Sequence, residues 1–172
     1  MKIMEQKCIF CAIVGNQIPS FKVYEDDNFM AFLDIRPLNK GHALVIPKNH
    51  YRWTYDVEAF GLYWEVAKKI AQAQINSLEA KFVQFLTAGL EVPHAHIHVI
   101  PRFENDGHGI YPDPSAVKQI NEQEMKETME KIKAGIPEEK PKVEEKPPEP
   151  VKEEKQWTEE ELEMMRRDLE QT

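Results

Sequence analysis

The chain lacks any long apolar stretch. No uncharged run approaches the roughly 18 residues that a membrane-spanning helix needs. The first residues carry the acidic Glu5 and no apolar core of the kind that a signal peptide has. We therefore expect neither a membrane span nor a signal peptide, and we expect a soluble, cytoplasmic protein.

The chain also lacks a surplus of basic side chains. It has 22 Lys and Arg against 30 Asp and Glu, a formal net charge of −8. Binding to the phosphates of a nucleic acid requires a basic surface, so we expect no general nucleic-acid binding. The acidic surplus is concentrated in residues 137–172, where seven basic and thirteen acidic residues give −6 and leave −2 for residues 1–136.

Cysteine is scarce, because Cys8 and Cys11 are the only two. In an intracellular chain such a pair is not expected to form a disulfide framework. A Cys-x-x-Cys pair fits a redox pair or half of a tetrahedral zinc site. It also fits two small buried apolar side chains, so the residues alone leave the role of this pair open.

The hydrophobic pattern predicts five short strands and one long helix. Expected elements are a short helix over 8–14 ended by Gly15, strands over 21–24, 29–34, 43–47, 81–87 and 95–100, and a long helix over 57–78. This order predicts an α+β fold, an antiparallel sheet with its helices gathered on one side. The chain is long enough for one such domain and an appendage.

The C-terminal third divides into three parts. Asn121 to Glu124 has the form of a helix start, and Gly135 is a plausible end, so we place the domain boundary at residue 136. Residues 137–156, rich in Pro, Glu and Lys, read as an extended charged linker. Residues 157–172 read as a short amphipathic helix that either folds back on its own domain or a second subunit, or docks on a partner protein.

The most informative run is His94-Ala95-His96-Ile97-His98, in which imidazoles alternate with apolar side chains. In an extended strand the three imidazoles share one face and the apolar residues face a core. Imidazole acts as nucleophile, proton carrier or metal ligand near neutral pH. The alternatives are a histidine-rich metal patch and an exposed face without function.

Three segments together resemble the histidine triad (HIT) family of nucleotide hydrolases and transferases. They are the histidine run, Asp34-Ile35-Arg36-Pro37, and the segment from Gly41 to His50. The resemblance covers approximately residues 8 to 104. It implies a HIT-like five-stranded antiparallel sheet with one long helix and shorter flanking helices, a homodimer, and a purine nucleotide or nucleotide conjugate as substrate.

The resemblance also implies roles for individual residues. His96 would attack the α-phosphorus and form a nucleotidyl-histidine that water resolves, while His98 and His42 contact the phosphate and one of them protonates the leaving group. Asp34 would accept hydrogen bonds from the two ribose hydroxyls. The base-binding slot would consist of Phe10, Ile13, Phe32 and Ile35.

By the same resemblance, a zinc-bearing bacterial or archaeal-type member of the family would hold Zn²⁺ between the cysteine pair and two histidines. The ligands would be Cys8, Cys11, His50 and His94. Four protein ligands leave no open coordination position, so the metal is expected to be structural and not to activate water.

One segment departs from the family pattern. Many relatives carry Gly-Gln and then Ser, Thr or Glu ahead of the triad, whereas this chain has Gly89-Leu90-Glu91. Leu90 cannot donate a hydrogen bond to phosphate, which affects the choice of substrate more than nucleotide binding itself. His108 has no clear counterpart in the family and is interpreted as a solvated loop histidine.

The sequence thus favours an enzyme that cleaves at the α-phosphorus of dinucleoside polyphosphates or nucleoside phosphoramidates. Retention of His42, His96 and His98 supports it. The alternatives are a nucleotide-binding adaptor with weak catalysis and a C-terminal docking helix, which Leu90 and the tail favour, and a nucleotidyl transferase.

Overall fold

A computed structural model describes residues 8–138 and 158–170. The described residues divide between Pro137 and Glu138 into two units, and each is described by itself. The predicted linker, residues 137–156, lies almost wholly outside the described residues, as does Trp157. None of the described helices is long and apolar enough to cross a membrane.

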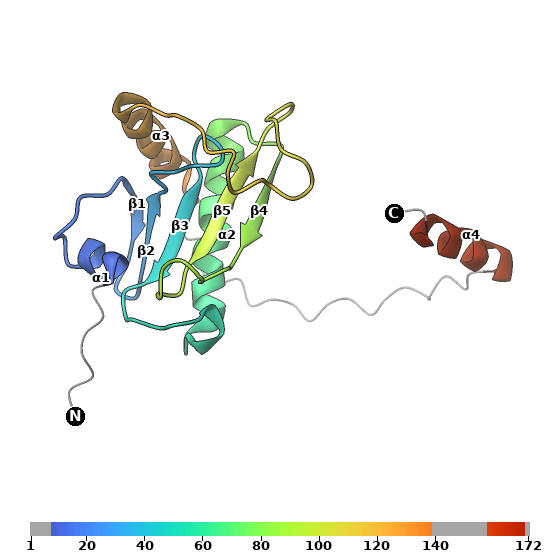
Figure 1. Cartoon of the computed structure of the whole chain (residues 1–172), viewed down its shortest axis with the longest axis horizontal. Helices are drawn as coiled ribbons and strands as arrows, with labels where there is room; N and C mark the ends of the chain where they lie inside the picture. The colour runs from blue at the N-terminus through green and yellow to red at the C-terminus, as the bar shows by residue number, and fades with distance from the viewer. Residues whose placement is uncertain (1–7, 139–157, 171–172) are drawn as a thin grey trace. The chain divides into compact units, whose positions relative to one another are not determined.

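The first unit is built on one five-stranded antiparallel sheet, as predicted (Figure 1). Each strand pairs antiparallel with its neighbours in the order β1-β2-β3-β5-β4. The strands are β1 (Lys22–Glu25), β2 (Phe29–Leu33), β3 (Ala43–Pro47), β4 (Phe82–Leu86) and β5 (Ile97–Arg102). The predicted α+β class and the number of strands are therefore confirmed.

One face of the sheet packs against helices α2 (Phe60–Leu78) and α3 (Glu122–Gly135). The apolar members of the histidine run, Ala95, Ile97 and Val99, belong to the core on this face. The predicted alternation of imidazoles with core residues is therefore confirmed, because Ala95, Ile97 and Val99 lie in the core and the histidines lie between them in the sequence. Helix α3 begins at an Asn121 cap whose side chain accepts the Glu124 N–H.

The opposite face of the sheet carries helix α1 (Ile9–Val14). Phe10 and Ile13, three residues apart on this helix, are buried in a second apolar cluster with Phe32 and Leu44. The expectation that the helices gather on one side is therefore wrong for α1. Alternate residues of β2 and β3 point away from α2, and the short apolar face of α1 covers their side chains.

Strand β5 begins at Ile97, two residues later than the predicted strand. Its pairing with β3 runs only from Ile97 to Val99, because the Ala95 N–H donates to the Tyr51 carbonyl and not to a strand. His94 and His96 thus lie on an irregular segment that leads into β5, and only His98 lies within it. The prediction of one strand beneath all three histidines is wrong in this detail.

Helix α2 begins at Phe60 and not at Val57, because a 3-10 turn, η1 (Thr54–Asp56), occupies the preceding residues and Val57 is extended. Within α2, Gln74 is fully buried. Its Nε2 donates to the carbonyls of Gly41 at 2.8 Å and Val99 at 3.0 Å. One side chain of the helix thus joins two backbone segments that neighbour His42 and His98.

The second unit contains helix α4 (Glu159–Glu170). Its start has a capping box, in which the Glu161 N–H donates to the Thr158 hydroxyl and the Thr158 N–H donates to the Glu161 carboxylate. Leu162 and Met164 expose 41% and 54% of their surface. This helix therefore carries apolar side chains that its own unit does not bury.

Candidate active site and metal centre

His96 is buried, and its ring orientation is set by its own neighbour in the chain. Its Nδ1 lies 2.7 Å from the His94 carbonyl oxygen. Because a carbonyl only accepts hydrogen bonds, Nδ1 carries the proton and Nε2 keeps its lone pair. Burial lowers the pKa of His96, so the ring is neutral at physiological pH. The residue is therefore in the state that a nucleophilic imidazole requires.

His42 and His98 form a hydrogen-bonded pair beside it. The Leu38 N–H donates to His42 Nδ1 at 3.2 Å, so His42 carries its proton on Nε2 and donates it to His98 Nδ1 at 3.0 Å. His98 must then carry its own proton on Nε2. Burial lowers the pKa of His42 to about 3 and that of His98 to about 4. The rings of His98 and His96 are 4.9 Å apart, so a neutral N–H donor neighbours the candidate nucleophile.

Asp34 follows β2 directly and lies beside the imidazole pair. Its Oδ1 accepts the Arg36 N–H at 2.8 Å, and its Oδ2 is 3.8 Å from His42 Nδ1. The donor atoms of Asp34, His42 and His98 lie within 4.8 Å of one another. They do not suit a metal, because both ring nitrogens of His42 are already hydrogen-bonded. The carboxylate is half-buried, which leaves part of it accessible to a ligand.

Three of the four predicted base-slot residues come together. Phe10, Ile13 and Phe32 are all buried in the cluster beneath α1. The ring of Phe10 meets Phe32 edge-on at 5.6 Å and His96 at 5.4 Å, which places this aromatic side chain directly against the candidate nucleophile. Ile35 is not part of this cluster and exposes 78% of its surface next to Asp34.

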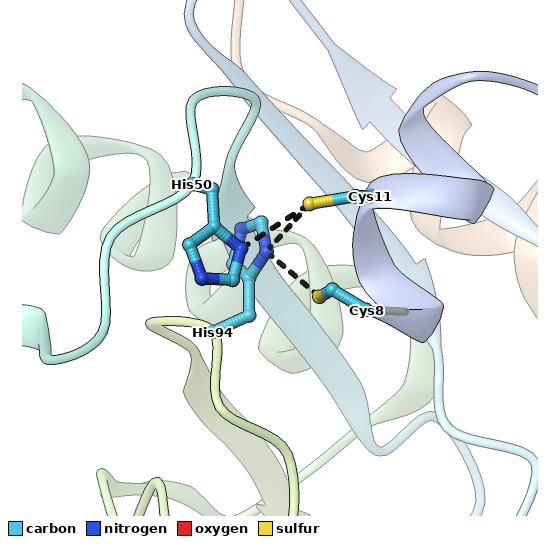
Figure 2. Close-up of side chains that lie close together, drawn as sticks. All are labelled: Cys8, Cys11, His50 and His94. Carbon is cyan, nitrogen blue, oxygen red and sulfur yellow. Dashed lines mark hydrogen bonds between the residues drawn. The ribbon is translucent and has the colours of Figure 1, made fainter. Parts of the chain in front are cut away.

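The two cysteines and two histidines converge as Figure 2 shows. Cys8 directly precedes α1 and Cys11 lies within it, His50 follows β3, and His94 precedes β5. Cys11 Sγ is 3.3 Å from His50 Nδ1 and 3.5 Å from His94 Nδ1, and Cys8 Sγ is 3.4 Å from His94 Nδ1. Residues more than eighty positions apart in the chain thus form one cluster.

The geometry of this cluster fits a tetrahedral metal. Zinc–sulfur and zinc–nitrogen bonds of ordinary length place a ligand sulfur about 3.6 Å from a ligand nitrogen, close to the distances found here. His94 donates its Nε2–H to the Pro47 carbonyl at 2.9 Å, which leaves the Nδ1 lone pair facing the sulfurs. Burial lowers the pKa of His94 to about 4, so the ring is in the neutral form that binds metal.

A buried ion pair braces the loop that follows β5, and sequence reasoning missed it. Arg102 Nε lies 2.6 Å from an Asp106 carboxylate oxygen, and both side chains are 5% exposed. Asn39 donates to the same carboxylate at 2.9 Å and to the Pro101 carbonyl at 3.0 Å. Arg102 holds the pKa of Asp106 well below its ordinary value. The loop that carries His42 is thereby joined to the end of β5.

His108 is a correction to the sequence interpretation. It is half-buried, and its Nε2 lies 2.9 Å from the Leu38 carbonyl, to which it can donate. Leu38 in turn donates its N–H to His42. The residue is therefore not a solvated loop histidine but a brace for the backbone that fixes the tautomer of His42. The Asp106 turn that precedes it was a weak signal of an ordered loop, because Asp106 accepts the His108 N–H.

Comparison with known proteins settles the family. The family model described as the HIT domain matches residues 15–105. The chain belongs to the HIT family. An uncharacterized HIT-like protein of Borreliella burgdorferi is 48% identical over 111 residues, which cover 59% of this chain and 80% of that protein.

Two further HIT relatives bear on the site. The adenosine 5'-monophosphoramidase HNT1 of Saccharomyces cerevisiae is 38% identical over 102 residues, which cover 58% of this chain and 65% of that enzyme. The crystal structure of a Zn-bound histidine triad family protein from Mycobacterium smegmatis superposes with a TM-score of 0.61. That structure is 33% identical, and the match covers 76% of this chain and 93% of that one.

Proposed function

We propose that this HIT protein is a nucleotidyl hydrolase that cleaves at the α-phosphorus of purine nucleotide derivatives, either dinucleoside polyphosphates or nucleoside phosphoramidates. The observation that carries the proposal is the tautomer of His96. Its Nδ1–H is held by the His94 carbonyl, which leaves Nε2 unprotonated in a buried site. Similarity to the yeast adenosine 5'-monophosphoramidase supports this class of substrate.

The proposed reaction has two displacements. His96 Nε2 forms a bond to the α-phosphorus, and the bond to the leaving group breaks with its electron pair. His98 donates a hydrogen bond from Nε2 to the departing nitrogen or oxygen, which takes up a proton from solvent as it leaves. Water then attacks the phosphorus, the bond to His96 breaks, and a proton of that water passes to solvent. Donors aimed at the phosphate oxygens stabilise the charge that these oxygens carry.

Substrate binding uses residues around this centre. Asp34 has carboxylate oxygens that suit the two hydroxyls of a ribose. We assign the base to the apolar side chains of Phe10, Ile13, Phe32 and Ile35, of which Phe10 contacts His96 and Ile35 is open to solvent. His42 acts through His98, because its hydrogen bond keeps the His98 proton on Nε2.

The test is turnover of an adenosine phosphoramidate by His96→Ala protein. Turnover should be lost while AMP binding remains, because the imidazole is needed only for bond formation. Tyr111→Ala is the matched control, because Tyr111 is 88% exposed. Mass spectrometry of wild-type protein quenched during turnover should find one added nucleotidyl group on the peptide that contains His96. Unchanged turnover by His96→Ala protein would refute the assignment.

We also propose that Zn²⁺ binds Cys8, Cys11, His50 and His94 in a structural role. The spacing of the sulfur and nitrogen atoms and the free Nδ1 lone pair of His94 support it. Similarity to the Zn-bound mycobacterial structure supports the same choice of metal. Bound zinc would fix α1 to the segment that carries His96, two residues beyond His94.

The exposed edge of the sheet supports a homodimer. Strand β4 is an end strand, and Phe82, Phe85 and Leu86 expose 43–50% of their surface. An exposed apolar edge strand is prone to pairing with another chain unless it is covered. A second copy of the same strand, running antiparallel, would continue the sheet and satisfy the free backbone groups. We propose this as the dimer contact.

Helix α4 supports a second function beside hydrolysis. It lies beyond residues 15–105, where the HIT domain matches, and it carries the exposed Leu162 and Met164. Such a capped helix with apolar side chains is a usual form of docking segment. We propose that it binds a partner protein, as in the adaptor hypothesis, while the first unit retains catalysis.

A further inference from the structure

A cavity of about 160 Å³ opens beside the candidate nucleophile. Its lining includes His96, Arg52, Trp53, Tyr55 and Gly89. The three residues placed at the ribose and phosphate, namely Asp34, His42 and His98, are not among those that line it. The cavity is therefore separate from the nucleoside side of the site and shares only the nucleophile with it.

Arg52 supplies a positive charge to this cavity. Its guanidinium lies over the Trp53 ring, 3.9 Å from the centroid, and its Nη1 donates to the Gly89 carbonyl. A guanidinium has five N–H donors, so further donors remain after this bond. Among the residues that the structure describes, no carboxylate lies within ion-pair distance of Arg52.

Arg52 is the charged side chain that lines the cavity. It is half-buried there, whereas Glu91 is exposed and is not among the residues that line it. Because the lining residues include no carboxylate, the guanidinium favours an anion in this space.

The residues around Arg52 pack closely against one another. Trp53 stacks on Tyr55 with an interplanar angle of 14° and 6.0 Å between centroids. Gly89 adopts a positive φ of 65°, and a Cβ there would lie 3.2 Å from the Trp53 ring. Only glycine fits this close approach without strain, so the loop before the histidines is shaped around the Arg52–Trp53 pair.

We propose that this cavity binds an oxyanion carried by the leaving group, a carboxylate or a sulfate, with Arg52 as the residue that determines specificity. The inference rests on the proposed hydrolase function. With the α-phosphorus at His96 and the ribose at Asp34, the remainder of the substrate extends toward the free cavity. A guanidinium binds oxyanions through paired hydrogen bonds to two of their oxygen atoms.

The test compares adenosine conjugates that differ in leaving-group charge. Adenosine phosphoramidates of alanine and of alaninamide differ only in the carboxylate, and adenylyl sulfate supplies the sulfate arm. Arg52→Gln should lower kcat/KM for the anionic conjugates by about tenfold, the value of one charge-assisted hydrogen bond, with little change for alaninamide. Arg52→Lys, which keeps the charge, should recover part of the loss. The arm with the larger effect identifies the preferred oxyanion.

The contrary outcomes are separable. An equal loss on charged and neutral conjugates would mean that Arg52 merely holds Gly89, and no loss on any conjugate would also overturn the inference. If wild-type protein turns over none of them, the proposal of phosphoramidate hydrolysis fails. The cavity is then judged by calorimetric binding of the alanine and alaninamide conjugates to His96→Ala protein. Arg52→Gln in that background should abolish a preference for the carboxylate, and the absence of any preference would overturn the inference.

Discussion

At the scale of single residues, main-chain groups set the tautomers of His42, His94 and His96, and His42 in turn sets that of His98. The His94 carbonyl accepts a hydrogen bond from His96 Nδ1, and the Pro47 carbonyl accepts one from His94 Nε2. The Leu38 N–H donates to His42 Nδ1. The opposite nitrogen of each ring is thereby left for the role that we propose for it, which is phosphorus attack in His96, metal binding in His94 and hydrogen-bond donation in His42. Because these partners are backbone groups, the assignment depends on the path of the chain and not on neighbouring side chains.

Burial of His42 predicts a specific loss of stability in acid. Its pKa falls from 6.5 to about 3 on folding, so at pH values between these the unfolded chain takes a proton that the folded chain refuses. The free energy of unfolding should therefore decrease as the pH is lowered, by up to about 1.4 kcal/mol per pH unit for this group. Urea unfolding of wild-type and His42→Gln protein measures it. The variant should show a shallower fall from about pH 7 to about pH 5, and parallel curves would contradict the prediction.

The Arg102–Asp106 pair predicts a large effect of one substitution. Asp106→Ala leaves a buried guanidinium without its partner, which should destabilise the protein by about 3 kcal/mol. Glu104→Ala is the matched control, because Glu104 is 75% exposed and lies 4.0 Å from Lys81. It should cost less than about 1 kcal/mol. Chemical unfolding measures the free energy of unfolding of both variants. Equal decreases would show that the buried ion pair stabilises the protein no more than an exposed one.

At the scale of elements, α1 has only six residues, too few for a helix to be stable by itself. Its start has no side-chain cap, so packing by Phe10 and Ile13 and the proposed metal must hold it. Helix α1 carries Phe10, which contacts His96, so this contact depends on the packing and the proposed metal ligands that hold α1 in place.

Removal of zinc should loosen α1 first. Purified protein should contain about one zinc per chain by elemental analysis. After chelation, hydrogen exchange should accelerate in residues 8–14, while β3, which is buried throughout, keeps its protection. Cys11→Ser should reproduce the effect without a chelator. Metal-free protein with undiminished protection of α1 would assign Cys8 and Cys11 to simple packing.

If β4 forms the dimer contact, a charged substitution on this strand should weaken dimerisation. Leu86→Lys places two ammonium groups at the proposed contact between copies, which should raise the dissociation constant on the order of 100-fold. Ile18→Lys is the matched control, because Ile18 is 36% exposed and precedes β1, at the other end of the sheet. Analytical ultracentrifugation distinguishes the two. Equal association of both variants would place the dimer contact elsewhere.

At the scale of the whole molecule, the residues proposed for chemistry all belong to the unit that precedes Glu138. Removal of residues 138–172 should therefore leave kcat/KM within about twofold, as expected for independent units. Steady-state turnover of an adenosine phosphoramidate by full-length and shortened protein measures this. A marked loss would mean that the second unit completes the site or the dimer, and the docking proposal would then be withdrawn.

Sequence reasoning reached the sheet because its signals are local. The alternation of apolar residues around His96 and the apolar runs of β2 and β3 are read along the chain. It did not reach Arg52, Gln74 or the Asn39 bond to Pro101, because these contacts join residues 25 to 62 positions apart. No periodicity encodes such pairs, so only the folded chain reveals them.

The buried amide of Gln74 has a consequence for how the protein fails. Its Nε2 bridges the carbonyls that adjoin His42 and His98, and so adds a second link between segments that the Ala43–Val99 pairing of β3 and β5 already joins. Local opening of α2 would leave both carbonyls without this donor and would weaken the spacing of the two imidazoles. The activity that we propose would then report on the docking of that helix.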